Sequence, residues 1–203
     1  MAIPERSIDE IRSRCRTLFI DDDEFDIVAI LAKQRWKVDR VPDVTTFEDA
    51  PLVSSHVVFV DIHGVGRALG FADEGLGLAK AIKERFPQKK VVIYSAEKQG
   101  DRFHPVLSMA DARLPKDAEP YQFLTTLEGL ARECFTVELC ARRIRQAIES
   151  ELGGGAARVD ESKILALLGS PRIEASSIAQ RLGVTIQAAA NIAHIISAFN
   201  AKP

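Results

Sequence analysis

Residues 56–64 read HVVFVDIHG, an apolar and β-branched run that ends in Asp61 and a turn-prone His-Gly pair. Such a run is typical of a strand that is buried on both faces of a parallel sheet. It delivers one carboxylate to the C-terminal end of the strand, the edge at which open α/β sheets bind ligands. A second apolar run, residues 17–20, leads directly into Asp21, Asp22 and Asp23. Two strands can therefore bring several carboxylates together.

Carboxylates that gather at one sheet edge repel one another unless a cation neutralises them. Hard oxygen ligands that are few and open to water suit Mg²⁺, which keeps several of its own waters. We therefore predict a magnesium site among these strand-end carboxylates. The alternative for either cluster alone is that strand-end aspartates only cap the helices that follow.

The composition indicates a globular protein: the chain has 203 residues, of which 46% are hydrophobic and 28% charged, with a net charge of -2. This length predicts one full domain plus a smaller module, because domains most often span about 100–150 residues. The charge argues against a strongly basic nucleic-acid-binding surface. We expect a cytoplasmic protein, since no apolar run approaches the ~20 residues of a membrane span and the N-terminus lacks a signal peptide's apolar core. Cys15, Cys134 and Cys140 lack metal-ligand spacing and favour buried, reduced thiols.

Further patterns predict an α/β fold, in which a doubly wound five-stranded parallel sheet has helices on both faces. The remaining strands are expected at residues 38–41, 91–95 and 112–114. Helices are expected at residues 7–16, 25–36 and 74–86, with a short one after Pro42. The segment HGVGRALGFADE after Asp61 is long for a strand-to-helix loop, which usually has about 2–6 residues, so we expect it to be functional or mobile.

The strand-end groups together make a coherent reaction site. Ser95 ends the fourth expected strand, and Lys116 follows the fifth. Carboxylates can hold a cation, one carboxylate can attack phosphorus, and a hydroxyl and an ammonium can hold phosphoryl oxygens. Phosphoryl transfer needs mainly positioning and charge neutralisation, which this set supplies.

Four pieces of the sequence occur in the order and at the strand ends found in the receiver domain of two-component response regulators. They are LFIDDDE, VVFVD, VVIYSAE and LPK, and residues 15–130 resemble that domain. The resemblance implies a flavodoxin-like fold and a switch that accepts a phosphoryl group on Asp61 and hydrolyses it slowly. It also implies that Ser95 and Lys116 contact the phosphoryl oxygens.

The same resemblance implies a cofactor and a partner. Mg²⁺ would be held by Asp21, Asp22, Asp61 and the backbone carbonyl of His63. A histidine kinase, a phosphotransfer protein or a small acyl phosphate would be the phosphodonor.

Three features depart from the family pattern. Asp117 stands where the family usually has a proline, and Arg113 stands where it has an aromatic residue. The third feature is the glycine-rich insertion after Asp61. A degenerate receiver that works without phosphate is therefore an alternative.

A second alternative is a phosphatase of the haloacid-dehalogenase-like class, because Asp21 and Asp23 satisfy its Asp-x-Asp start. Asp21 would then be the nucleophile and Asp23 the acid and base. That class needs a further acidic pair after the lysine, and no strand-like run beyond Lys116 ends in paired carboxylates. It also leaves Asp61 without a role.

Residues 121–150 predict one long helix, in which apolar residues recur at heptad spacing. This helix either pairs two copies of the chain or packs its first half on the sheet and its second half on the C-terminal module. The triple glycine at residues 153–155 marks a flexible joint. We therefore expect a receiver-like domain with an N-terminal helical extension over residues 1–130, a connecting helix and linker over 131–155, and an output module over 156–203.

The output module is expected to be a small all-α domain with helices at residues 160–168, 174–182 and 185–199. The last two resemble a helix-turn-helix. The final helix contains no Lys or Arg, although phosphate contacts supply much of the affinity for DNA. It also has more apolar surface than one face of a three-helix unit normally buries. We therefore expect protein association, most simply as a homodimer, with DNA binding as the alternative.

Overall fold

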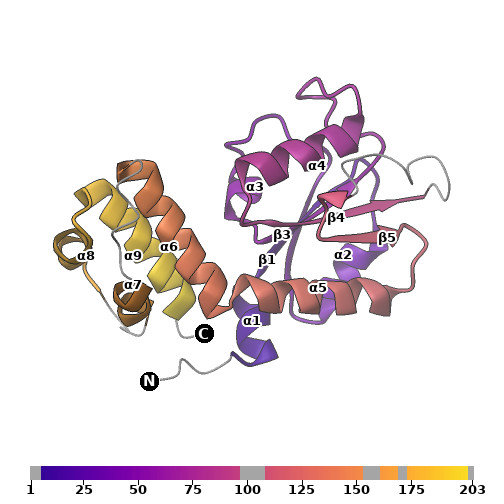
Figure 1. Ribbon diagram of the computed structural model, residues 1–203. Coiled ribbons are helices and arrows are strands. Elements are labelled where there is room, and N and C mark those ends of the chain that lie inside the picture. Colours follow the sequence, from indigo (N-terminus) through magenta and orange to yellow (C-terminus); the bar gives the residue numbers. More distant parts are fainter. Residues whose placement is uncertain (1–5, 97–107, 153–160, 169–172, 201–203) are drawn as a thin grey trace. The chain divides into compact units, whose positions relative to one another are not determined.

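The computed structural model describes residues 6–96, 108–152, 161–168 and 173–200. The chain forms two compact units, and the sheet unit, Ile11–Cys134, contains all the strands in Figure 1. The helical unit comprises the helices that follow Phe135 together with the N-terminal residues up to Glu10. Each unit has a hydrophobic core of its own, as separate domains do.

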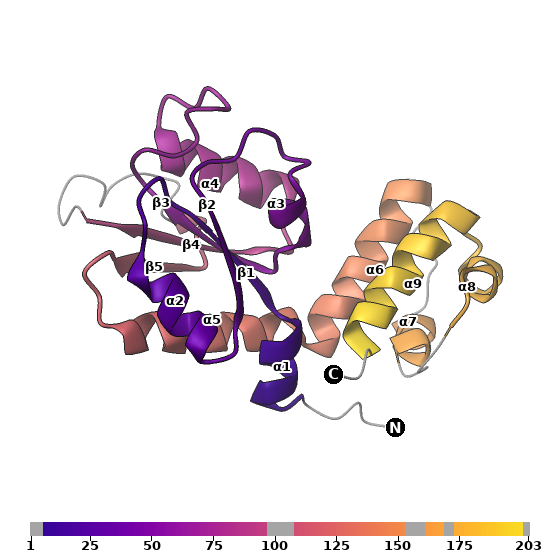
Figure 2. The ribbon, with the colours of Figure 1, turned by 180° about the vertical axis from the view of Figure 1, so that it is seen from behind.

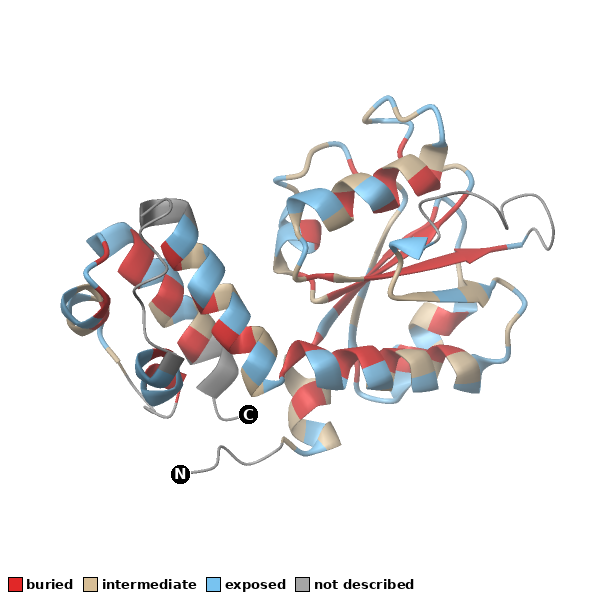
Figure 3. Cartoon of the chain, in the orientation of Figure 1, coloured by how far each residue is buried: buried red, intermediate tan, exposed pale blue. Residues whose placement is uncertain are grey.

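The sheet unit is built on five strands in the order β2-β1-β3-β4-β5, and every neighbouring pair is parallel. The strands are β1 Arg16–Ile20, β2 Lys37–Val41, β3 Val57–Asp61, β4 Lys90–Ser95 and β5 Ala112–Pro115. The central strand β3 is buried at every residue, as its continuous apolar run predicts (Figure 3). The outer strands β2 and β5 carry exposed residues, which is usual at a sheet edge. The predicted doubly wound α/β fold is confirmed.

Helices cover both faces of this sheet, as Figures 1 and 2 show from opposite sides. One face is covered by α3 Ala50–Ser54 and α4 Glu74–Arg85, and the other by α2 Asp26–Lys33 and α5 Pro120–Cys134. Helix α1 Ile8–Arg14 comes before β1 and begins with a capping box. In this box the Ser7 hydroxyl accepts the Glu10 N–H at 3.3 Å, and the Glu10 carboxylate accepts the Ser7 N–H at 3.0 Å.

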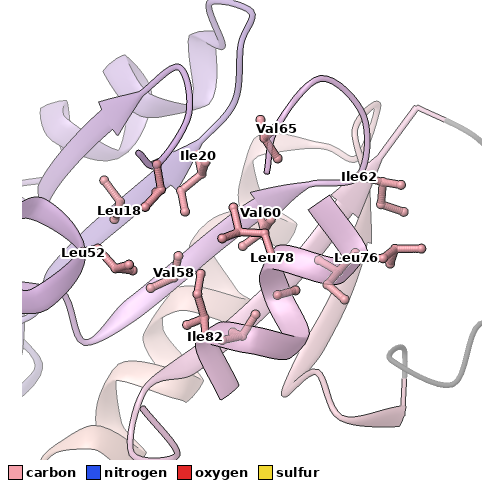
Figure 4. Packing of buried hydrophobic residues seen from close by; sticks show 14 residues of the cluster. Leu18, Ile20, Leu52, Val58, Val60, Ile62, Val65, Leu76, Leu78 and Ile82 are labelled. Atoms are coloured by element: carbon pink, nitrogen blue, oxygen red, sulfur yellow. The ribbon is translucent and has the colours of Figure 1, made fainter. Parts of the chain in front are cut away.

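The core on the α4 face consists of aliphatic side chains that alternate along the strands (Figure 4). Leu18, Ile20, Val58 and Val60 point from β1 and β3 toward α4, which contributes Leu76, Leu78 and Ile82. Val65 of the segment after β3 is also fully buried in this cluster. The insertion after Asp61 is therefore partly a core element.

Aromatic rings fill the opposite face of the sheet. Phe19 of β1 and Phe59 of β3 stack with ring centroids 4.3 Å apart and planes 4° apart. Tyr94 of β4 and Phe123 of α5 meet edge to face at 6.1 Å. Such pairs contribute beyond their buried area, so these rings fix the side-chain positions on this face.

The single long helix expected over residues 121–150 is two helices, so that expectation is wrong. Helix α5 ends at Cys134, and α6 spans Val137–Leu152. Thr136 starts the second helix, because its hydroxyl accepts the N–H of Leu139 at 3.2 Å. A threonine that bonds the third residue of a helix is an N-cap, which ends one helical register and begins another.

The apolar residues at heptad spacing in α5 and α6 belong to two separate hydrophobic cores. Phe123, Leu127 and Leu130 are buried in the sheet unit. Ile144 and Ile148 belong to the core of the helical unit. The spacing is thus explained within one chain and gives no support for a seam between two copies.

The helical unit contains α6 together with α7 Glu161–Leu168, α8 Ala175–Leu182 and α9 Ile186–Asn200, which share one core. Gly183 ends α8 in the left-handed conformation, with φ of 68°. The Thr185 hydroxyl then accepts the N–H of Ala188 at 3.3 Å and caps α9. Within the described ranges, no helix combines the length and the apolar character needed to cross a membrane.

Helix α9 has less unpartnered apolar surface than the sequence predicts. Ile192 and Ile196 are buried, and Ile195 packs partly buried against the same core. The reason is that α6 packs against α9, whereas three helices alone were expected to form this module. Ile186 remains 60% exposed.

Lys89, just before β4, is a buried lysine with a structural role. It is 2% exposed, and its ammonium donates hydrogen bonds to the carbonyls of Ser55 at 2.5 Å and Val53 at 3.0 Å. These carbonyls lie at the end of α3, where helix carbonyls have no partner within the helix. Lys89 therefore satisfies two acceptors in a dry site.

We expect Lys89→Met to lower the free energy of unfolding by about 1–3 kcal/mol, because buried acceptors lose their donor. Urea denaturation measures this change. Lys80, whose side chain is 53% exposed on α4, provides the control. Lys80→Met should alter stability by less than about 0.5 kcal/mol. Equal effects of the two variants would contradict the role given to Lys89.

Candidate functional site

Four polar residues lie at the C-terminal edge of the sheet, because parallel strands end at the same edge. Asp21 follows β1, Asp61 ends β3, Ser95 ends β4, and Lys116 follows β5. The backbone N–H of Lys116 donates to the Ser95 carbonyl at 2.7 Å and joins the last two of these positions. The strand ends thus lie at one edge, as the sequence pattern predicts.

The three predicted metal-binding aspartates form one cluster. One carboxylate oxygen each from Asp21, Asp22 and Asp61 lies within 4.8 Å of the others. Asp21 and Asp61 are buried, while Asp22 is exposed to solvent. Hard oxygen donors with one side open to water fit Mg²⁺, which retains part of its hydration shell.

Gly64 lies directly against this cluster. A Cβ atom built on Gly64 would be 2.1 Å from Oδ2 of Asp22, and the residue has φ of +80°. Both the space and the backbone conformation require glycine. The segment after β3 therefore forms one wall of the acidic cluster.

Lys116 joins two of the buried carboxylates. Its ammonium donates to Oδ2 of Asp61 at 2.7 Å and to Oδ1 of Asp21 at 3.1 Å. Burial alone would lower the pKa of Lys116, but the hydrogen bonds to Asp61 and Asp21 raise it above its usual value. The ammonium is therefore held in its charged form.

Asp61 has both oxygens engaged. Its Oδ1 accepts the N–H of Ile62 at 2.8 Å, and its Oδ2 accepts the Lys116 ammonium. Burial raises the pKa of Asp61 above its usual value, and the hydrogen bond and charge of Lys116 offset only part of that rise. A group that approached Oδ2 would have to share or displace the ammonium.

Tyr94 is a member of the site that the strand-end reasoning missed. Its hydroxyl donates to Oδ2 of Asp21 at 2.7 Å. Burial raises the pKa of the Tyr94 phenol far above its usual value, and the Asp21 carboxylate adds to the rise. The phenol therefore stays protonated and acts as a hydrogen-bond donor. The sequence feature that could have indicated this role is a tyrosine directly before Ser95 in an otherwise aliphatic strand.

Arg40 of β2 fixes the backbone of the acidic segment. Its guanidinium donates to the carbonyls of Asp21 at 2.7 Å and Asp23 at 3.1 Å. The N–H of Asp23 in turn donates to Oδ1 of Asp21 at 3.0 Å. The turn after β1 is thus held by bonds to a neighbouring strand as well as by its own.

The insertion after Asp61 is fastened to the sheet unit by two carboxylates that the sequence did not single out. Asp43 accepts the N–H of Gly66 at 2.6 Å and of Ala68 at 3.0 Å. Glu74 accepts the N–H of Gly64 at 2.8 Å. The bond from Gly64, followed by that from Arg67, lowers the pKa of Glu74 below its usual value. These bonds hold the loop in one place.

The remaining predicted residues take the following positions. The side chain of His63 is 53% exposed, with Nδ1 4.0 Å from Oε2 of Glu74. The metal contact expected from its backbone carbonyl stays a prediction. Ser95 is buried, and the contact expected from its hydroxyl also stays a prediction. Arg113 and Asp117, the two departures from the family pattern, are both exposed.

Comparisons with known proteins find similarity in structure only. No protein-family model matches the chain. No curated protein sequence matches it either.

Several solved structures resemble the chain. RcsB from Salmonella enterica serovar Typhimurium, bound to promoter P1flhDC in the presence of the phosphomimetic BeF3-, aligns with a TM-score of 0.50 at 19% identity, covering 91% of this chain and 91% of that chain. The receiver domain of NtrX from Brucella abortus aligns with a TM-score of 0.45 at 22% identity, over 57% of this chain and 97% of that one. A response regulator from Thermotoga maritima aligns with a TM-score of 0.45 at 20% identity, covering 58% of this chain and 97% of that chain.

The strand order β2-β1-β3-β4-β5 is that of the flavodoxin-like doubly wound sheet. Together with the alignment to RcsB, it shows that the sheet unit has the receiver fold that the sequence resemblance implies.

The wall formed by Gly64 gives a prediction with a matched control. Gly64→Ala should weaken Mg²⁺ binding, because the added methyl group displaces the Asp22 carboxylate. Gly70 has a similar φ of +77° but no atom within 4 Å of a built Cβ, so Gly70→Ala has comparable backbone strain without the collision. Mg²⁺ titration should show a higher dissociation constant for Gly64→Ala only. Equal weakening in both variants would mean that strain, and not contact with Asp22, is responsible.

Proposed function

We propose that the chain is a signalling regulator of the response-regulator type, which accepts a phosphoryl group on Asp61. The observation that carries this proposal is the cluster of Asp21, Asp22 and Asp61. The ammonium of Lys116 bonds two of these carboxylates, those of Asp21 and Asp61. An attacking carboxylate, oxygen ligands for a cation and a cationic side chain beside the attacking oxygen are the parts that phosphoryl transfer needs. The receiver fold of the sheet unit agrees with this assignment.

In the proposed reaction, one carboxylate oxygen of Asp61 attacks the phosphorus atom of the donor. The bond from phosphorus to the donor's leaving group breaks, and an acyl phosphate forms on Asp61. The Lys116 ammonium, now 2.7 Å from Oδ2 of Asp61, would then donate a hydrogen bond to a phosphoryl oxygen. Ser95, at the end of the neighbouring strand, is proposed to donate its hydroxyl to another of these oxygens. Water later attacks the phosphorus atom, the bond from phosphorus to the Asp61 oxygen breaks, and inorganic phosphate leaves the regenerated carboxylate.

Asp21, Asp22, Asp61 and the carbonyl of His63 are proposed to hold Mg²⁺. When bound, the ion supplies positive charge that offsets the repulsion between the carboxylates and the incoming phosphoryl group. The proposed phosphodonor is a histidine kinase, a phosphotransfer protein or a small acyl phosphate.

The phosphatase alternative is less well supported by the geometry. Asp21, its required nucleophile, has no exposed surface, and its oxygens accept bonds from Tyr94, Lys116 and the N–H of Asp23. Such a carboxylate is a poor nucleophile because each bond must be broken or shared. Asp61 keeps some side-chain exposure, and the group on its Oδ2 is a flexible lysine.

A receiver that works without phosphate is the second candidate. The observation that favours it is the Lys116 bridge itself, which already compensates two buried carboxylates. In that case the bridge would be a permanent structural link. The exposed Arg113, in place of the aromatic residue of the family pattern, agrees with a lost switch.

We propose that the helical unit serves as the output and mainly contacts protein, most simply a second copy of the chain. Helix α9 carries neither acidic nor basic residues in its first and last turns. Contacts to DNA phosphates need cations, so this helix is poorly equipped to enter a groove. Its exposed Ile186 is suited to an apolar contact. DNA binding is the alternative.

Incubation of the full chain with acetyl phosphate and Mg²⁺ tests the proposed reaction. We expect a mass increase of one phosphoryl group by intact-mass spectrometry, which should disappear in Asp61→Asn and on removal of Mg²⁺ with EDTA. Asp117→Asn, a nearby exposed aspartate, should keep the adduct. A wild-type chain that never gains the mass would favour the phosphate-independent receiver. An adduct that persists in Asp61→Asn would place the chemistry on another residue.

Sedimentation of the full chain tests the proposed output. We expect a dimer that Ile186→Asp shifts toward monomer, since a charge would replace a side chain buried on association. Val53→Asp, at a site 53% exposed in the sheet unit, is the control and should leave the dimer intact. A wild-type monomer that retards duplex DNA at physiological salt would instead support the DNA-binding alternative.

A further inference from the structure

The two oxygens of Asp21 have different partners. Oδ1 faces Lys116 at 3.1 Å and accepts the N–H of Asp23 at 3.0 Å. Oδ2 accepts the hydroxyl of Tyr94 at 2.7 Å. Tyr94 is 1% exposed and Asp21 is 0% exposed, so this bond is shielded from water. A buried charge-assisted bond of this kind is strong and well defined in geometry.

The ring of Tyr94 cannot turn away easily. It stacks on Phe25 with ring centroids 5.4 Å apart and meets Phe19 edge to face at 5.9 Å. Phe123 closes another side at 6.1 Å. The hydroxyl is therefore held at a fixed position by packing, and it holds Oδ2 of Asp21 there in turn.

We propose that Tyr94 is a positioning residue that restricts Asp21 to one metal-facing oxygen and thereby favours Mg²⁺ over Ca²⁺. This inference rests on the proposed function, since it concerns the same acidic cluster. It adds a determinant of cation selectivity that comes from the aromatic side of the sheet, opposite to the aliphatic core.

The coordination chemistry of the two ions gives the reason. Mg²⁺ requires six ligands at near-ideal octahedral positions and is usually held by carboxylates through one oxygen. Ca²⁺ takes six to eight oxygens and accepts both oxygens of a carboxylate. For Asp21 to bind an ion with both oxygens, Oδ2 must share its hydrogen bond to Tyr94 with the ion or give it up, which makes two-oxygen binding less favourable. Hydrogen bonds to metal ligands are known to fix their orientation in this manner.

The alternative is that Tyr94 only stabilises the fold, by filling space and by satisfying a buried carboxylate. Loss of the hydroxyl would then lower the melting temperature but would change the affinities for the two ions by the same factor. The ratio of the dissociation constants for Mg²⁺ and Ca²⁺ therefore distinguishes a positioning role of Tyr94 from a purely stabilising one.

The test measures dissociation constants for Mg²⁺ and Ca²⁺ on the full chain, by competition with Mn²⁺ followed by EPR. In Tyr94→Phe the preference for Mg²⁺ over Ca²⁺ should fall about tenfold, the lower end of the usual effect of removing a partner of a metal ligand. Tyr94→Leu removes the hydroxyl with a different side chain and should lower the preference in the same direction. Phe123→Leu loosens the packing around Tyr94 but keeps the hydroxyl, so it should lower the preference clearly less than Tyr94→Phe does.

The outcomes are distinct. An unchanged preference in Tyr94→Phe, with Mg²⁺ still bound by the wild type, overturns this inference and leaves the proposed function standing. A change of equal size in Phe123→Leu also overturns it, because packing alone would then explain the effect. A wild-type chain that binds neither ion contradicts the proposed function itself.

Discussion

The bridge from the Lys116 ammonium to Asp21 and Asp61 is the interaction on which the site depends. Both carboxylates are almost completely buried, and two buried negative charges side by side would be strongly unfavourable without a cation. The bridge is possible only because β5 brings Lys116 to the same edge as β1 and β3. In turn, the backbone bond from Lys116 to Ser95 fixes the end of β5 against β4. The charge balance of the site therefore depends on the position of β5 at the sheet edge.

Close packing behind Asp61 explains why the loop after it is long and rich in glycine. A Cβ atom on Gly75, at the start of α4, would be 1.8 Å from the carbonyl oxygen of Asp61. The helix thus starts against the strand end, and the N–H of Gly75 bonds the Ile62 carbonyl at 2.9 Å. The chain must leave the strand, pass Asp22 at Gly64 and return to this point. Asp43 and Glu74 hold the path in place.

The sequence predicts the fold and much of the site because both depend on local patterns. Apolar runs that lead into Asp61, Ser95 and Lys116 mark strand ends. Because the strands are parallel, these ends lie at one edge of the sheet. The bond from Tyr94 to Asp21 was not predictable, since it depends on the side chains of one strand reaching past another. The break at Thr136 was missed because the apolar spacing continues across it while the hydroxyl caps a new helix. The packing of α6 on the C-terminal helices was one of two alternatives that the sequence left open, because periodicity shows an apolar face but not what covers it.

The charges of the cluster link its two proposed ligands. Three carboxylates and one ammonium leave two negative charges uncompensated, which is the charge that one divalent cation neutralises. A phosphoryl group on Asp61 would replace a single negative charge with about −1.5 to −2. The cluster would then attract a divalent cation more strongly than before. By reciprocity of linked binding equilibria, the bound cation must favour the phosphorylated state to the same extent. Tyr94 and Lys116 act on opposite oxygens of Asp21, so this coupling depends on both the aromatic cluster and the sheet edge.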